Sequence, residues 1–406
     1  IFKFEYIPIN IFNMLKPFAS SQWFKQLFGF EESVANVCQY LSITKASNNS
    51  TKLISLKNNT NYISGNIEIT NISSLENSVS DLISKSKSKT NRYGKLNVVH
   101  GLGFNSSPKF MQYVDVMSCC SYPQFNGATI QVASNFNCLE FESEYQRKED
   151  GVTIYALDYT QGPTASLSCA AASIYRNYFY KNDDFNIHFN SDDSHTNSPK
   201  NIFLNDEINL LSKTPLNVNH GKVMIKNQKE IDRLKSLNFD WKNLQNYFIA
   251  NHTNCEVCLK RSDNFIKDNY FQLYHNKNHF VNQIFASAFN FSSNVILCPF
   301  TVEIAQNLLH AEYKSTILAA IKNSISFSNL PGSSQCFLTL LGGGVFANPP
   351  EIVAPSIARN AELIAESGID VNVVCFNNES FSANFPLLEN AMRLTGGRII
   401  TTKDDY

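Results

Sequence analysis

A glycine loop near the end of the chain has the strongest potential for ligand chemistry. Gly342–Gly344 follow the apolar run 336–341 and precede a predicted helix that begins near Glu351. Glycines let the backbone approach a ligand closely, and successive N–H groups in such a turn point into one concavity that suits an anion. The start of the helix adds the positive end of its dipole. The pattern predicts a cradle for a phosphate group, and the alternative is a tight turn that only packs strand on helix.

In a second segment, two amide side chains and a carboxylate follow the end of a predicted apolar strand. Asn135, Asn137 and Glu140 follow the apolar residues 128–133. An asparagine side chain offers both a donor and an acceptor, which suits the hydroxyl groups of a ribose. The alternative is that the two asparagines only cap a turn.

A third segment, DYTQGPT, joins a predicted strand at 152–157 to a predicted helix at 163–178. The start of this helix is a second candidate anion cradle, and Asp158 could act as a general base or orient a water molecule. An ordinary helix cap is the alternative. Arg176 lies near the end of the same helix, where it could bind a phosphate bidentately or stabilise the helix C-terminus.

The spacing of apolar residues places these segments among alternating strands and helices. Such alternation favours an α/β fold with a parallel or mixed sheet that is covered on both faces. Ligands of open α/β sheets bind at the carboxyl ends of the strands, where all three segments would lie. Further strands are predicted at 95–100, 280–289, 370–376 and 398–401, and further helices at 74–89, 302–323, 351–366 and 387–395.

Length and composition indicate one large elaborated domain. The 406 residues are 43% hydrophobic, which is ample for a buried core. We expect an N-terminal extension at 1–30, with Met14 as a candidate start, and one α/β domain at 31–406 that carries a polar insertion at about 181–282.

Charge and cysteine usage limit the partners and the compartment. The net charge of −1 gives no general attraction to nucleic acid or to an anionic membrane, and no apolar run is long enough to predict a membrane span. Several of the ten cysteines lie in apolar runs, as buried thiols of a reducing compartment do. We therefore expect a cytoplasmic or nuclear protein with neither a nucleic-acid nor a membrane partner.

Together, the three segments resemble the macro domain, an α/β/α module that binds ADP-ribose. The resemblance implies a three-layer α/β/α mixed sheet with large insertions. It also implies that Asn135 and Asn137 contact the distal ribose, while Gln161-Gly162 and the loop 342–348 hold the diphosphate. Phe346 would take the aromatic position of that loop, and Ala347 stands where the loop usually has glycine.

A weaker resemblance links the chain to poly(ADP-ribose) glycohydrolase, in which a GGG loop precedes a catalytic glutamate pair. Here a single glutamate, Glu351, follows at a shifted spacing. The runs EDGVTIYALDYTQGP and LTLLGGGVFANP also resemble a widespread sequence family to which no activity is attached. That likeness supports one folding unit from about residue 30 to the end.

Two other readings involve metal ions. The last strands are similar to those of von Willebrand A-like domains, which bind a metal through a DxSxS motif, and Asp115 to Ser118 is the nearest candidate at a different spacing. His252, Cys255 and Cys258 could supply three zinc ligands, with two ordinary loop thiols as the alternative. We predict neither a metal site nor a cofactor.

Three functions remain as hypotheses. The first is binding of ADP-ribose or a related nucleotide diphosphate with hydrolysis of an ADP-ribosyl bond, which would also make an ADP-ribosylated protein a partner. The second is a reader that binds without turnover, and the third is a structural or partner-binding protein. The candidate catalytic residues are Asp158, Glu351 and Glu140, and the candidate ligand-binding residues are Asn135, Asn137, Thr160, Gln161, Gly162, Arg176, Gly342, Gly343, Gly344, Val345, Phe346 and Asn348.

Overall fold

The computed structural model of the chain describes residues 16–46, 50–85, 93–143, 145–180, 208–261, 271–292 and 295–403. The candidate start at Met14 and the polar run 181–202 of the predicted insertion lie outside these residues.

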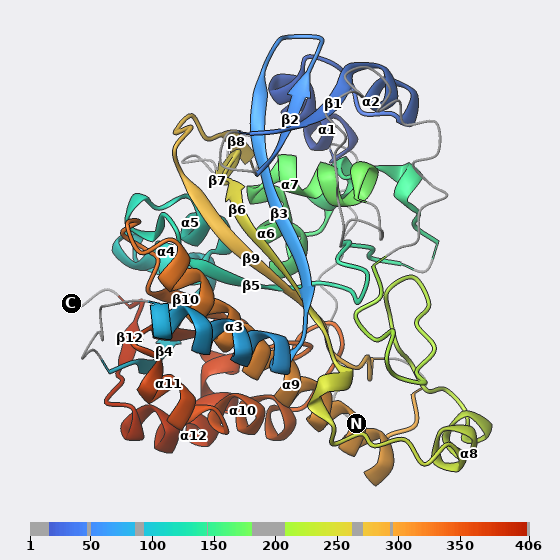
Figure 1. Ribbon diagram of the computed structural model, residues 1–406, viewed down its shortest axis with the longest axis vertical. Helices are drawn as coiled ribbons and strands as arrows, with labels where there is room; N and C mark the ends of the chain where they lie inside the picture. Colours follow the sequence, from blue (N-terminus) through green and yellow to red (C-terminus); the bar gives the residue numbers. More distant parts are fainter. Residues whose placement is uncertain are drawn as a thin grey trace.

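A single twisted sheet runs through the molecule (Figure 1). Within the described residues it has ten strands in the order β1-β2-β3-β6-β9-β5-β10-β11-β4-β12, and β7 and β8 form a separate pair. The bounds are β1 Leu41–Lys45, β2 Thr51–Ser55, β3 Asn61–Thr70, β4 Lys95–His100, β5 Thr129–Ala133, β6 Ile249–Glu256, β7 Leu259–Arg261, β8 Phe271–Leu273, β9 Phe280–Ala286, β10 Gln335–Leu338, β11 Asp370–Cys375 and β12 Ile399–Thr401.

The sheet has a parallel half and an antiparallel wing. Neighbours from β9 through β5, β10, β11 and β4 to β12 are parallel, whereas β1, β2, β3, β6 and β9 pair antiparallel. The carboxyl ends of the parallel strands therefore meet at one edge of the sheet. The central strands are buried on both faces, as the apolar residues of β10 and the mostly apolar residues of β11 require.

Helices cover both faces of the sheet, which gives the predicted α/β/α layers (Figure 1). One layer contains α3, α9, α10, α11 and α12, and the other contains α4 to α7. The bounds are α1 Lys16–Phe28, α2 Val34–Tyr40, α3 Ile72–Lys85, α4 Met111–Val114, α5 Val116–Ser121, α6 Gln161–Ser168, α7 Ala170–Ile174, α8 Gln228–Ser236, α9 Pro299–Ser326, α10 Pro350–Ala358, α11 Ala361–Ser367 and α12 Asn378–Leu394.

The long helix α9 is central to its layer. It packs against β5, β6, β9 and β10 on one side and against α3 and α10 on the other. A helix that is covered on most sides buries apolar residues around its whole circumference, and α9 has this pattern from Ile304 to Ile321.

Four predicted elements differ from the structure, and one of them is the helix predicted at 387–395, which begins at Asn378 as α12. Residues Thr153–Leu157 form a 3₁₀-helix rather than a strand, because Glu32 takes the N–H groups of Val152 and Thr153 that a strand would pair. The helix predicted at 163–178 breaks at Cys169, where the backbone leaves the helical region (φ −111°, ψ 62°), and ends as a π-helix at Tyr175–Phe179. The helix predicted at 351–366 is two helices, since the side chain of Asn360 closes α10 on the carbonyls of Ser356 and Ile357.

The predicted insertion is only partly an insertion. Residues 249–256 form β6 in the main sheet, between β3 and β9. The strand escaped prediction because its buried residues include Asn251 and His252 rather than an apolar run.

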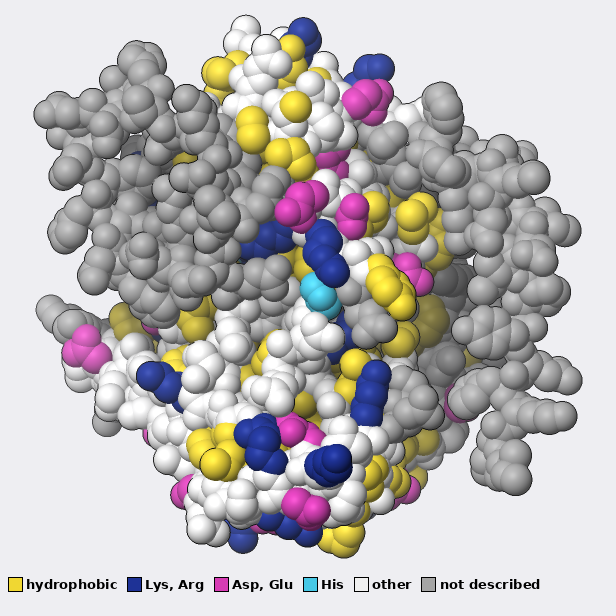
Figure 2. Space-filling view, turned by 90° about the vertical axis from the view of Figure 1, so that its right-hand side faces the viewer, with side chains coloured by type: hydrophobic (Ala, Val, Ile, Leu, Met, Phe, Trp, Pro, Cys, Tyr) yellow, Lys and Arg dark blue, Asp and Glu magenta, His cyan; other side chains and the backbone are white. Residues whose placement is uncertain are grey.

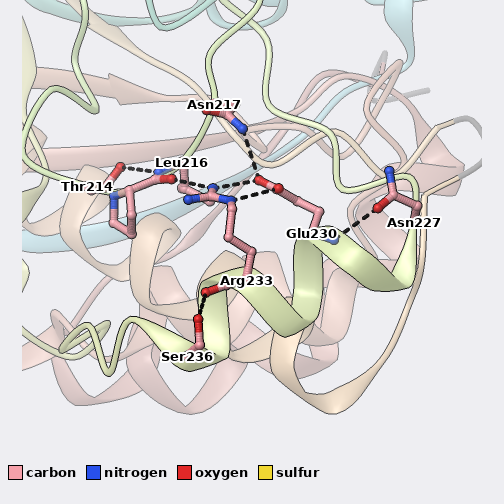
Figure 3. Close-up of polar contacts among 8 residues, drawn as sticks. Thr214, Leu216, Asn217, Asn227, Glu230, Arg233 and Ser236 are labelled. Carbon is pink, nitrogen blue, oxygen red and sulfur yellow. Dashed lines mark hydrogen bonds and ion pairs between the residues drawn. The ribbon is translucent and has the colours of Figure 1, made fainter.

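In part of the insertion, side chains of α8 hold a neighbouring loop through hydrogen bonds (Figure 3). Arg233 donates from Nε to Glu230 at 2.9 Å and from Nη2 to the carbonyl of Pro215 at 2.8 Å. Asn217 also donates to Glu230, at 3.1 Å. These contacts fix the loop at 214–217, which leads into a turn at 219–222.

Charged side chains of both signs lie side by side across the described part of one face (Figure 2). No helix within the described ranges is both long and apolar enough to cross a membrane. The cysteines predicted as buried thiols, Cys138, Cys169, Cys336 and Cys375, are buried and unpaired.

Candidate functional site

The order in which the chain adds strands to the sheet reverses between β5 and β10. The chain leaves β5 toward β6 and β9 on one side, and it leaves β10 toward β11 on the other. These two strands share only two residue pairs, Thr129 with Cys336 and Ile130 with Phe337. Beyond them the strands separate, and a crevice at such a switch point is where ligands of open α/β sheets bind.

Two glutamine side chains occupy the separation. Gln161 accepts from the N–H of Ala133 at 2.7 Å and donates to the carbonyl of Gln131 at 2.6 Å, as a neighbouring strand would. The side chain of Gln131 accepts from the N–H of Thr339 at 3.3 Å. The backbone groups that β10 leaves unpaired are thereby satisfied while the strands stay apart.

A cavity of about 340 Å³ opens at this separation, on the face that carries α4 to α6. Ile130, Phe337 and Val374 from the three central strands form an apolar floor. Three aromatic side chains also line the cavity, Tyr113, Tyr159 and Phe376, of which Tyr159 and Phe376 are exposed at 43% and 40%. Such walls suit a flat, largely apolar group.

Asp115, one partner of a buried ion pair, lines the same cavity. Asp115 accepts from Nη1 of Arg261 at 2.8 Å, and both side chains are at most 10% exposed. The other contacts of Asp115, from the N–H of Met117 and the hydroxyl of Ser118, cap α5. The residues that resembled a DxSxS motif thus hold a helix start and an arginine.

The glycine loop follows three residues after Thr339 of the cavity wall. Asn348 closes it, because Nδ2 donates to the carbonyls of Phe289 (2.7 Å) and Gly342 (3.3 Å). Within the described residues the N–H groups of Gly344, Val345 and Phe346 donate to no acceptor. The loop is therefore preformed and presents three successive free donors, as an anion cradle requires.

Two residues of this loop region have informative conformations. Ala347 has a φ of +54°, so the position that is usually glycine keeps the left-handed backbone without one. Glu351 lies in the first turn of α10 and is exposed. Its predicted catalytic role stays a prediction.

The two asparagines after β5 shape their own loop. Nδ2 of Asn135 donates to the carbonyls of Leu139 (3.0 Å) and Phe141 (3.1 Å), and Oδ1 of Asn137 accepts from the N–H of Leu139 (3.2 Å). The backbone of Gly221, in the turn at 219–222, covers them, since a Cβ there would lie 2.6 Å from that of Asn135. Both amides are buried, and their predicted contact with a ribose stays a prediction.

Glu140 lies directly behind the cavity wall. Its Oε1 accepts from the hydroxyl of Ser166 at 2.8 Å, and its Oε2 would lie 2.7 Å from a Cβ at Gly162, one residue beyond Gln161. Burial raises the pKa of Glu140 to about 7, against the lowering contributions of Ser166, Ser134 and Arg176. Gly162, predicted as a ligand contact, is a close-packing position here, because a Cβ would also collide with the carbonyl of Ala133.

Arg176 points into the protein. Its guanidinium donates to the carbonyl of Cys138 (3.1 Å), Nδ1 of His252 (3.1 Å) and the hydroxyls of Ser173 (3.1 Å) and Ser166 (3.4 Å). It also lies 3.9 Å from the ring centroid of Phe285 and is 2% exposed. The guanidinium is thus engaged inside the protein rather than at the cavity.

Asp158, Thr160 and Gln161 form the start of α6 at the cavity. Oδ1 of Asp158 accepts from the N–H of Thr160 at 2.8 Å, and Thr160 and Gln161 line the cavity. Of the predicted site residues, these two are the ones in the cavity wall.

The contacts of His252, Cys255 and Cys258 do not favour the predicted alternative of a zinc site. Nδ1 of His252 is engaged by Arg176, and Cys255 and Cys258 are buried. Across the described ranges no group of three or more His, Cys, Asp and Glu side chains is arranged to hold a metal ion.

Two features escaped the sequence analysis. The cavity is formed by residues such as Phe337 and Val374 that the sequence shows only as strand core. The second feature is Glu312 of α9, whose side chain is 1% exposed and faces the sheet layer near Ser287. A helix that is covered on both sides offers no polar stripe from which the burial of a carboxyl group could be predicted.

No protein-family model matches the chain, and no curated protein matches it. Solved structures that it resembles are poly(ADP-ribose) glycohydrolases, the class suggested by the GGG loop. The structure from Thermomonospora curvata is 10% identical, with a TM-score of 0.41 over 91% of this chain and 97% of that one. The apo structure from Deinococcus radiodurans is 11% identical, with a TM-score of 0.38 over 80% and 93%. A complex of that protein with ADP-ribose is 12% identical, with a TM-score of 0.39 over 80% and 94%. These likenesses are too distant to assign a ligand or an activity.

Proposed function

We propose that the chain binds ADP-ribose or a related nucleotide diphosphate at the carboxyl edge of the sheet and hydrolyses an ADP-ribosyl bond. The carrying observation is the pairing of the cavity at the β5–β10 separation with the preformed glycine loop that follows the same strand β10. The cavity supports binding of a flat base, and the free N–H groups of Gly344, Val345 and Phe346 support binding of the diphosphate.

Glu140 is the residue best suited to the chemistry. Its pKa of about 7 lets it hold or release a proton near neutral pH. In the proposed step the bond between the anomeric carbon and the departing oxygen breaks, and that oxygen takes the proton of Glu140. The oxygen of a water molecule bonds to the anomeric carbon, and the proton it loses returns to Glu140. Asp158, on the neighbouring turn, would orient the water.

The second candidate is a reader that binds the same ligand without turnover. The observation that favours it is the low exposure of Glu140, 6%, which leaves this carboxyl behind the wall rather than in the cavity. Binding is common to the two candidates, so binding is tested first.

Substitution of Gly344 tests the anion cradle. A Cβ at this position meets nothing within 4 Å and its φ is not positive, so Gly344→Ala and Gly344→Asp both fit. Calorimetry with ADP-ribose should give similar affinity for the wild type and Gly344→Ala. We expect about tenfold or more weakening for Gly344→Asp, because like charges a few ångströms apart cost roughly 1–2 kcal/mol near a surface. No heat of binding from the wild type at high micromolar ligand would exclude both candidates.

Turnover then separates the enzyme from the reader. Release of ADP-ribose from a modified protein should be lost in Glu140→Gln while binding is kept. Glu362→Gln, at an exposed position in the first turn of α11, provides the comparison. If the wild type binds but releases nothing, the reader is correct.

A further inference from the structure

A continuous chain of hydrogen bonds runs from Glu140 into the interior. Nη2 of Arg176 donates to the hydroxyl of Ser166 at 3.4 Å, and this hydroxyl donates to Oε1 of Glu140 at 2.8 Å. Nη1 of Arg176 donates to Nδ1 of His252 at 3.1 Å. The single hydroxyl proton of Ser166 goes to Glu140, and the Ser166 oxygen accepts from Arg176, whose guanidinium can only donate.

The backbone is adapted to hold this chain. Arg176 lies in the π-helix Tyr175–Phe179, a rare form that is often found at functional sites. Ser166 lies in α6, before the break at Cys169 that separates it from the following helical turn. The side chains of Ser166, Ser173, Arg176 and His252 are all at most 2% exposed. A buried guanidinium is costly unless its donors are satisfied, and here they are held by neutral acceptors.

Few ionisable groups lie around Glu140 and Arg176 in this chain of hydrogen bonds. Glu140 faces Arg176 from the π-helix, Asp158 from the turn before α6, Tyr155 from the 3₁₀-helix and Cys138 from its own loop. Arg176 faces His252 and Cys255 of β6. Arg176 is thus the group among them that favours a charged Glu140, whereas Asp158 opposes it.

We propose that Ser166 and Arg176 are positioning residues that orient the carboxyl of Glu140 behind the cavity wall and stabilise its charged form. This role rests on the proposed function, because it gives Glu140 its place in the reaction. Oε1 accepts from Ser166, and the hydroxyl of Ser134 also contacts the carboxyl group. Oε2 lies beside Gly162 and the cavity wall, and in this proposal it is the oxygen that exchanges a proton with water. Neither serine nor arginine touches the ligand in this arrangement.

The test measures the titration of Glu140 without any ligand. In each background, the free energy of unfolding in urea is measured against pH with Glu140 present and with Glu140→Gln. The difference between the two curves isolates Glu140, whose raised folded pKa makes stability fall as pH rises from 4.5 to about 7. Glu256, whose pKa burial also raises to about 7, remains in both proteins of each pair and cancels.

Two buried serines give a matched comparison. Ser166→Ala removes a donor to the charged carboxylate, so the midpoint of Glu140 should move upward by about one pH unit. Ser173→Ala removes the other serine contact of Arg176 Nη2 but no contact of Glu140, and its midpoint should stay within a few tenths of the wild type. Arg176→Lys should move the midpoint in the same direction as Ser166→Ala, since a lysine keeps the charge but loses the fork.

The outcomes are distinguishable from failure of the proposed function. An upward shift that is confined to Ser166→Ala and Arg176→Lys supports the positioning role even if no ADP-ribosyl substrate is turned over. An unchanged midpoint in Ser166→Ala, or an equal shift in Ser173→Ala, overturns it whatever the activity. Where turnover is found, the pH profile of kcat/KM should move with the midpoint, and at pH 7 the fraction of charged Glu140 should fall about fivefold.

Discussion

At the scale of single residues, Glu312 is a carboxyl group that the surrounding protein does not satisfy. Neither of its oxygens has a hydrogen-bond partner of normal geometry among the described residues, although the backbone of Ser287 lies close enough to lower its pKa. Burial outweighs this contact and holds the pKa of Glu312 well above its usual range. The native protein therefore keeps this side chain neutral where the unfolded chain would be charged.

This imbalance predicts a pH dependence of stability. The folded pKa is raised, so the stability present at pH values below 4.5 is lost as pH rises above it, by about 1.4 kcal/mol per pH unit until the folded pKa is reached. Glu312→Gln has nearly the same shape and does not ionise. Urea unfolding from pH 5 to 8 should show a shallower decline for the variant, and equal slopes in the two proteins would contradict the burial of this charge.

The individual site residues show which contacts can be predicted from neighbouring positions in the sequence. Gly342–Gly344 could be recognised because glycines after an apolar strand have few other uses. The link from Glu140 to Arg176 through Ser166 could not, since it joins residues 26 and 10 positions apart across a helix break that no periodicity reveals. The buried state of Asn135 and Asn137 depends on Gly221, which is even farther along the chain.

At the scale of elements, Gln161 at the start of α6 takes the place of a strand. Its two hydrogen bonds satisfy Ala133 and Gln131 on the side of β5 that β10 has left. Strands β10 and β11 were predictable because apolar residues predominate in them, whereas β6 was not, because Asn251, His252, Thr253 and Asn254 follow one another in its middle. The point at which β5 and β10 separate is a property of three-dimensional pairing, so no sequence pattern indicates the cavity.

Replacing Gln161 should expose this dependence. Gln161→Ala leaves a backbone donor and a backbone acceptor without their partners, and we expect a loss of about 1–2 kcal/mol in the free energy of unfolding. Gln228→Ala, on α8, removes a hydrogen bond between exposed side chains and should cost no more than about 0.5 kcal/mol. Equal losses in the two variants would show that solvent replaces Gln161 in the wall.

At the scale of the whole molecule, the side chain of Glu32 joins the N-terminal region to the segment that leads into α6. Glu32, between α1 and α2, accepts from the N–H groups of Val152 (2.9 Å) and Thr153 (2.8 Å) and from the hydroxyl of Tyr178 (2.9 Å). Trp23, Phe24 and other side chains of α1 are also buried in the main core. The described part of the predicted N-terminal extension therefore belongs to the folded body.

Removing this attachment should loosen the segment that leads into α6. Glu32→Ala leaves buried donors unpaired, and we expect a loss of roughly 2–3 kcal/mol together with faster proteolysis of residues 145–160. Glu31→Ala, one residue away, removes only an exposed ion pair with Lys25 and should change stability by less than about 0.5 kcal/mol. A similar cleavage pattern in the two variants would show that Glu32 does not hold this segment.

The separation between β5 and β10 also has a dynamic consequence. Two residue pairs and two glutamine side chains join the antiparallel wing, with β9 and β5, to the remaining parallel strands. A sheet with so narrow a join opens there before it opens elsewhere, because fewer bonds must break. Deuterium should therefore enter the amides of Ala133 and Thr339 sooner than those of the flanking strands. A ligand that bridges the two halves would slow that entry at both positions at once.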